Sequence, residues 1–221
     1  GKFIPLQHCK RLIMKKYILI IIGILTSINL SAQTAEEYLD SVIEKMTSYD
    51  DISIVFNITN IQKDEFSDSS ITSSGFASIK GNSYIINMDG QEIICNSETL
   101  WTHLIYDEEV MVSEATEDSS PIFIIDTFKE NTTMSFVENN DIDIKIIEIK
   151  ENEGENFEKI QVSINKNNQS IKKIHVFINN EIYKEELIYE ITDFKTNQNL
   201  PDSMFIFDET QHPNVEVIDM R

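Results

Sequence analysis

The side chains that most often carry catalysis are few and widely scattered in this sequence. Beyond the first 32 residues the histidines are His103, His175 and His212, and the cysteine is Cys95. Zinc ligands usually occur at short, characteristic spacings, and many catalytic residues lie within recognised motifs; these four residues show neither. The sequence therefore predicts no metal site, no cofactor and no catalytic residue, and we expect the protein not to be an enzyme.

Acidic side chains are abundant, but their number singles out no pair for acid–base chemistry. The 221 residues include 38 acidic and 18 basic side chains, for a net charge of −20. Residues 139–143 gather oxygen ligands but lack the glycine and the distal glutamate of a calcium loop, so a solvated turn is expected there. An acidic chain of this kind repels phosphate, which argues against nucleic acid as a partner.

Residues 14–32 have the order of features of a secretory signal peptide. Two lysines precede a short apolar run, and small residues suited to a cleavage site follow it. The apolar run is shorter than the roughly 20 residues of a membrane-spanning helix, although an uncleaved anchor is the alternative. We expect residues 1–13 to be a mis-assigned extension, residues 14–32 to be removed on export, and residues 33–221 to form a single domain.

Removing the predicted leader makes the chain more acidic. Residues 33–221 carry 13 basic and 38 acidic side chains, a net charge of −25. Anionic lipid surfaces repel such a chain, so we expect a freely soluble monomer. A lone cysteine cannot form an intramolecular disulfide, so the hydrophobic core must stabilise the fold unaided.

One helix and then a long series of strands are predicted. Thr34 and Glu37 have the spacing of a capping box, and apolar residues recur at helical spacing from there to Met46. From Ile52 the apolar period changes to two, which indicates strands joined by tight turns. The expected strands are residues 52–58, 75–80, 83–88, 92–96, 100–106, 110–114, 143–150, 157–164, 171–178, 182–194 and 204–207.

Two features interrupt this simple pattern. Pro121 opens an apolar segment, residues 121–128, that is typical of a short helix inserted between strands. In addition, Tyr84 and Ile86 alternate with the equally apolar Ile85, whereas a half-exposed sheet normally alternates apolar with polar residues. Such strands need either two packed faces, or one packed face and one ligand cavity, and the pattern alone leaves both alternatives open.

Five stretches, residues 75–84, 92–101, 109–113, 120–123 and 213–221, carry a family resemblance. In this order behind a signal peptide, they make the chain similar to the periplasmic outer-membrane lipoprotein carriers, the LolA-like proteins, in their Bacteroidetes form. The resemblance implies a mainly β fold with helices. It would be an unclosed, strongly curved antiparallel β-barrel of about ten to eleven strands, with a helical lid over its concave apolar face.

The resemblance also assigns residues to a site. Many members hold the lid shut with an arginine, but this chain has Gly81 at that position, so such a latch is not expected here. The lid would contain Ile122, Phe123, Ile125 and Phe128. The acyl cavity would be lined by Ile54, Phe56, Ile58, Tyr84, Ile86, Met88, Ile93 and Trp101.

The implied function is that of a periplasmic chaperone that carries lipoproteins from the inner to the outer membrane by binding their acyl chains. Its partners would be acylated lipoproteins and an ATP-driven release complex of the inner membrane, with an outer-membrane acceptor as a further candidate. The alternative is a periplasmic sensor or adaptor of the same fold that binds a lipid or acyl group as a signal.

Overall fold

The computed structural model describes residues 33–63, 67–116, 129, 131–153, 157–178 and 184–221. Residues 34–221 belong to one compact unit. The predicted signal peptide and the extension before it lie outside the described residues. So do the four predicted lid residues, Ile122, Phe123, Ile125 and Phe128.

The helix α2 (Ala35–Thr47) begins where the capping box predicts. The Thr34 hydroxyl accepts a hydrogen bond from the Glu37 N–H at 3.1 Å, and the Glu37 carboxylate accepts one from the Thr34 N–H at 2.9 Å. These two bonds satisfy N–H groups that have no partner inside the helix, which fixes the start of the helix. The prediction of a capped amphipathic helix is confirmed, with Leu39 and Val42 fully buried.

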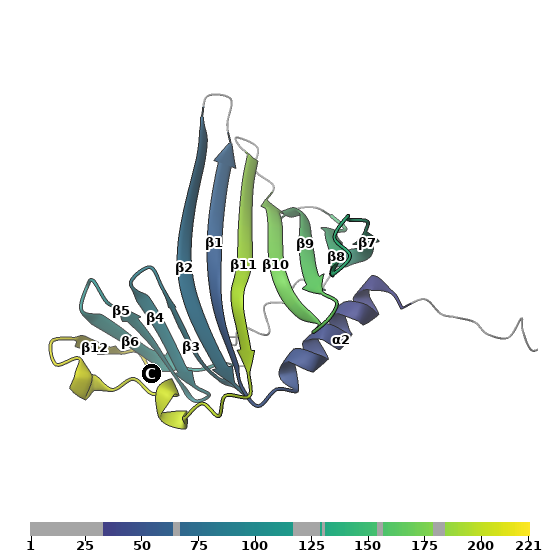
Figure 1. Cartoon of the computed structure of the whole chain (residues 1–221). Helices are drawn as coiled ribbons and strands as arrows, with labels where there is room; N and C mark the ends of the chain where they lie inside the picture. Colours follow the sequence, from purple (N-terminus) through teal and green to yellow (C-terminus); the bar gives the residue numbers. More distant parts are fainter. Residues whose placement is uncertain (1–32, 64–66, 117–128, 130, 154–156, 179–183) are drawn as a thin grey trace, which may run out of the picture. The chain divides into compact units, whose positions relative to one another are not determined.

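Twelve strands in the described part of the chain form one curved, unclosed sheet (Figure 1). Their order across the sheet is β12-β6-β5-β4-β3-β2-β1-β11-β10-β9-β8-β7. The strands are β1 (Ile52–Lys63), β2 (Asp68–Lys80), β3 (Ser83–Met88), β4 (Gln91–Asn96), β5 (Thr99–Leu104), β6 (Glu109–Glu114), β7 (Thr132–Val137), β8 (Ile144–Glu151), β9 (Phe157–Asn165), β10 (Ser170–Ile178), β11 (Lys184–Thr196) and β12 (Glu216–Asp219).

Neighbouring strands are antiparallel except at one edge, where β12 pairs with β6 in parallel. Most pairs are hairpins between consecutive strands, but the centre of the sheet joins distant parts of the chain, since Ile52 of β1 pairs with Thr196 of β11. The two described edges of the sheet are β12 and β7. The predicted fold class is confirmed, with these corrections to strand number and direction.

The expected strand at residues 204–207 was wrong, and two strands were missed. Residues 202–205 form a short 3-10 turn, η2 (Asp202–Phe205), after Pro201. Phe205 and Phe207 are buried while Ile206 is half-exposed, so burial does alternate along this segment. The alternation arises because the two phenylalanines pack onto the sheet, and not because the segment is a strand. The missed strands, β7 and β12, are short edge strands with few buried residues, and their apolar period is therefore weak.

The two faces of the sheet carry different cores. On the face that we call the α2 face, Leu39 and Val42 of the helix pack against fully buried residues of β8 and β9, among them Ile147 and Ile160. On the opposite face, the segment that contains Phe205 and Phe207 packs against β3, β4 and β6. Helix and C-terminal segment thus cover opposite faces of different halves of the sheet.

A buried carboxylate holds the start of the C-terminal segment. Asp51 is 1% exposed and accepts hydrogen bonds from the N–H groups of Gln198 at 2.7 Å and Leu200 at 3.1 Å. Burial alone would raise the pKa of Asp51, but these backbone donors, helped by the charge of Lys80, outweigh burial and lower the pKa from its ordinary value of 3.8. Lys80 completes the network by donating to the Leu200 carbonyl at 2.8 Å.

Candidate functional site

Seven of the eight predicted cavity residues lie on one face of the sheet. The register pairs Ile54 with Ala77 and Ala77 with Ile86, and it pairs Phe56 with Gly75 and Gly75 with Met88. Because directly paired residues point to the same face, the side chains of β1 and β3 align across β2. The seven residues on this shared face are Ile54, Phe56, Ile58, Tyr84, Ile86, Met88 and Ile93.

This face is the α2 face. Phe56 pairs with Ile191 of β11, and Ile191 packs against the core beneath the helix. Tyr84 is 2% exposed and lies in a separate small cluster with Ile79 and Cys95. The other six residues of the set are only half-buried, so the strands next to the helix-covered core present an apolar surface that is not fully packed.

The α2 face of β1 to β4 bears no charged side chain over its central rows. The residues of these rows are Ile52, Ile54, Phe56, Ile58, Gly75, Ala77, Ile79, Tyr84, Ile86, Met88, Gln91, Ile93 and Cys95. The polar groups on this face are the side chain of Gln91, the hydroxyl of Tyr84 and the side chain of Ser73, which pairs with Ile58. In a chain with 38 acidic side chains, such a surface can bind apolar material and offers nothing to an ionic ligand.

Gly75 lets the ring of Phe56 lie flat on the neighbouring strand. A Cβ atom at position 75 would lie 2.7 Å from Cζ of Phe56 and 2.7 Å from the carbonyl oxygen of Asn87. Both distances are far shorter than a carbon contact allows. The glycine in the middle of β2 is therefore explained by the close approach of an aromatic ring.

Trp101 does not join the other seven residues. It pairs with Ile94 and Val112, and all three lie in the cluster that Phe205 and Phe207 cover on the opposite face. The apolar character of both faces of β3 to β5 thus has two sources. One face packs under the C-terminal segment, and the other carries the half-buried apolar surface.

The three described histidines and Cys95 lie in two aromatic clusters and one apolar cluster. His103 is buried beneath Phe207 and His212, and Nε2 of His175 donates a hydrogen bond to the Glu186 carboxylate at 2.8 Å. Cys95 is buried in an apolar cluster. Among the residues that the structure describes, no three His, Cys, Asp or Glu side chains are grouped so that they could hold a metal ion.

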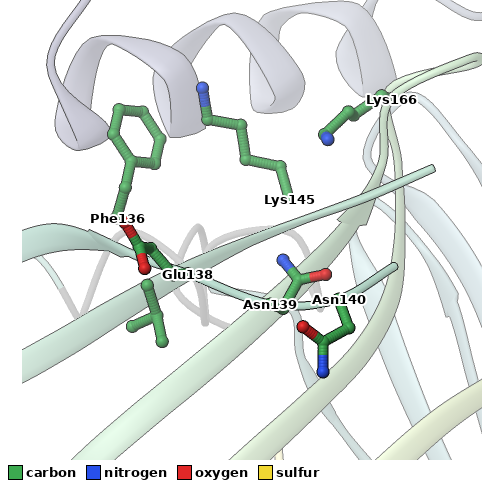
Figure 2. A pocket seen from close by; sticks show the side chains of 7 residues that line it. Phe136, Glu138, Asn139, Asn140, Lys145 and Lys166 are labelled. Carbon is green, nitrogen blue, oxygen red and sulfur yellow. The ribbon is translucent and has the colours of Figure 1, made fainter. Parts of the chain in front are cut away.

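A shallow pocket that the sequence did not suggest lies at the end of β7 (Figure 2). It has a volume of about 580 Å³ and is lined by Phe136, Val137, Glu138, Asn139, Asn140, Lys145 and Lys166. The Nζ atom of Lys145 lies 3.9 Å from the centre of the Phe136 ring and 5.0 Å from that of Tyr38 in α2. Lys145 interrupts the apolar alternation of β8, which is the signal that could have drawn attention to it.

No helix of the described residues combines the length and the apolar character that crossing a bilayer requires. Comparison with curated proteins finds no match. The fold is similar to that of an uncharacterised conserved protein from Thermus thermophilus, with 11% identity and a TM-score of 0.52 over 84% of this chain and 98% of that one.

Two further solved structures are similar in part. A LolA superfamily protein from Nitrosomonas europaea has 16% identity and a TM-score of 0.38, over 80% of this chain and 100% of that one. A putative outer membrane lipoprotein-sorting protein domain from Vibrio parahaemolyticus has 13% identity and a TM-score of 0.31, over 80% of this chain and 97% of that one.

The sequence itself provides the assignment. Residues 84–208 match the model of the family described as outer membrane lipoprotein carrier protein LolA. This range covers more than half of the 221 residues and runs from β3 to the C-terminal segment that packs on the opposite face. The predicted resemblance to the LolA-like proteins is confirmed, and the chain belongs to the LolA family.

Proposed function

We propose that this protein binds the acyl chains of lipoproteins on the α2 face of β1 to β4 and carries them through the periplasm from the inner to the outer membrane. Membership of the LolA family supports a role in lipoprotein binding or sorting. The uncharged, half-buried face supports the acyl chain as the part that is bound. Ile54, Phe56, Ile58, Tyr84, Ile86, Met88 and Ile93 are the proposed contacts, and Trp101 is left out because it lies on the opposite face.

The energetics of an acyl chain explain why a carrier is needed. Each buried methylene is worth about 0.8 kcal/mol, so a chain of about fifteen methylenes costs about 12 kcal/mol to expose to water. Unaided transfer between two membranes is negligible at that cost. An apolar protein surface roughly matches lipid, so loading requires an external source of energy, and an ATP-driven inner-membrane release complex is the proposed partner for that step.

The single observation that carries the proposal is the absence of charge from the α2 face between β1 and β4. Branched side chains and the aromatic Phe56 give this surface its area, while Met88 adds an unbranched chain that adapts to irregular ligands. The assignment of Ile122, Phe123, Ile125 and Phe128 as a lid over this surface stays a prediction from the sequence.

Placing a charge in this surface tests the proposal. We expect Met88→Glu to weaken saturable binding of an environment-sensitive acyl probe at least tenfold, because the carboxylate must be desolvated when the chain is bound. The matched control is Val55→Glu, which adds the same charge at an exposed apolar position on the opposite face of β1 and should leave binding unchanged. Equal effects of the two substitutions would show that acyl chains bind elsewhere or not at all.

The cargo and the compartment can be examined on the native protein. Mass spectrometry of lipids that co-purify with the protein from the periplasm should detect lipoprotein acyl chains. Recovery of the protein without bound lipid, or in the cytoplasm alone, would contradict the proposed carrier role.

A further inference from the structure

Two residues of β7, Met134 and Phe136, have backbone groups that point away from the neighbouring strand. The Asn131 carbonyl accepts a hydrogen bond from the Asn152 N–H at 2.9 Å, which makes this a hydrogen-bonded pair of the β7–β8 ladder. Since such pairs alternate in an antiparallel ladder, the backbone groups of Met134 and Phe136 point away from β8. In the part of the chain that the structure describes, these groups have no hydrogen-bond partner.

The two described edges of the sheet differ in how well they are protected. Natural edge strands usually avoid pairing with other chains by being short, by carrying charges or proline, or by containing a bulge. The β12 strand has four residues, two of which are Glu216 and Asp219. The six residues of β7, Thr-Thr-Met-Ser-Phe-Val, include neither a charged residue nor a proline, and their register with β8 is unbroken. β7 therefore has the properties of a strand that accepts a partner strand.

A positive charge lies directly above this edge. Lys145 extends from β8 over the Phe136 ring, and none of the described carboxylates lies within 4.0 Å of its ammonium group. Lys166 lines the same pocket and donates to the Ile142 carbonyl at 2.8 Å (Figure 2). Glu138 is the one carboxylate that lines the pocket, and Asp141 and Asp143 lie in the adjoining turn. The positive charge above the edge is therefore that of the Lys145 ammonium group rather than a net charge of the whole region.

We propose that β7 accepts an extended polypeptide segment as an additional strand, and that Lys145 and Lys166 recognise an acidic side chain of that segment. An added strand would lie about 4.8 Å beyond β7. Its side chains on the α2 face would lie beside Phe136, within reach of the ammonium of Lys145. The partner is thus a polypeptide that is extended and acidic at one position, and this interaction is separate from the proposed binding of acyl chains.

Peptides without any acyl group test this inference. We would compare three fluorescent peptides of alternating Thr and Val that differ at one central residue, which is Glu, Gln or Lys. At 0.15 M salt the Glu peptide should bind tightest in fluorescence anisotropy and the Lys peptide weakest. Non-specific attraction to an acidic protein would give the reverse order, because it favours the basic peptide.

Two further measurements locate the contact. Lys145→Gln should weaken binding of the Glu peptide about two- to fivefold and leave the Gln peptide unchanged. The control is Lys150→Gln, on the same strand but on the opposite face, where Lys150 pairs with Glu148 at 3.0 Å. In an added strand, the N–H groups of every second residue point to β7. N-methylation of those residues should abolish binding, and N-methylation of the residues between them should leave it unchanged.

Three outcomes would overturn the inference. The first is tightest binding by the Lys peptide. The second is equal binding by the two peptides that are N-methylated at opposite sets of alternate residues. The third is no binding of any peptide by a folded protein. An acyl-probe titration on the same sample reports the proposed carrier function separately, so a failure of one idea does not decide the other.

Discussion

At the residue scale, Gly75 controls how closely β2 approaches an aromatic ring of the neighbouring strand. The Phe56 ring occupies the space in which a side chain at position 75 would lie. A substitution there must move either the ring or the backbone of β3, since Asn87 contributes the second close contact. The residue thus links the backbone of the sheet directly to the proposed acyl-binding surface.

We expect Gly75→Ala to destabilise the protein by about 1–3 kcal/mol, as overpacking of a filled site does. It should also weaken acyl-probe binding, because the displaced Phe56 ring changes the shape of the surface. Urea denaturation and probe titration measure the two effects. Ser70→Ala, at an exposed position on the other face of β2, is the control. Unchanged stability would mean that the Phe56 ring does not lie over Gly75.

Asp51 is a second residue whose role can be tested, through pH. Its pKa in the folded protein is lower than in the unfolded chain, so its carboxylate stabilises the fold above a pH of about 4, and this contribution is lost as the pH falls further. We expect Asp51→Asn to lower the melting temperature at pH 7 and to flatten the decline in stability below pH 4. Thermal melts across this pH range, with the exposed Asp50→Asn as control, measure the effect. Parallel pH profiles for the wild type and Asp51→Asn would contradict it.

At the scale of elements, α2 is held by its apolar stripe. Leu39 and Val42 have no exposed surface, and the helix seals the core over β8 and β9. Propensity alone does not stabilise a helix of 13 residues in water, so docking on the sheet must supply most of its stability. The helix and the sheet are therefore expected to unfold together.

Truncating the stripe tests this dependence. Leu39→Ala should cost about 2–5 kcal/mol, because the cavity is formed in a fully buried site. Far-ultraviolet circular dichroism and tryptophan fluorescence should report a single coincident transition. The exposed Glu36→Ala in the same helix should cost far less. A separate early loss of helix signal would show that α2 unfolds independently of the sheet.

The elements that could be predicted are those whose own residues carry a clear pattern. The capping box at Thr34 located the helix, and strict alternation from Ile52 located β1. The same reasoning failed at residues 204–207, because burial at alternate positions does not require a ladder partner. The edge strand β7 was missed because none of its six residues is fully buried, so its apolar alternation is weak.

Patterns within single strands predicted only part of the candidate site, because they do not show which strands pair. Alternation put Tyr84, Ile86 and Met88 on one face, but the face of Trp101 depends on its pairing with Ile94, which no local pattern encodes. The pocket beside Lys145 is lined by residues of β7, of β8 and of the turn after β9, which only the folded sheet brings together. Such features arise from contacts between distant segments, so they appear only in the folded structure.

At the scale of the whole molecule, charge governs behaviour in solution. We expect residues 33–221 to sediment as a monomer at physiological salt, because copies that each carry a net −25 repel one another. Sedimentation equilibrium measures the mass directly. Raising the salt concentration screens the repulsion, so any weak association should strengthen with salt. A large stable assembly at low salt would contradict the expectation.

The pairing of β1 with β11 has a kinetic consequence. Ile52 cannot pair with Thr196 until nearly the whole chain has been synthesised, and a contact between such distant residues forms slowly. Until then, β1 lacks the partner strand on one of its two sides. A helper that shields the apolar side chains of β1 during that interval would therefore prevent premature aggregation.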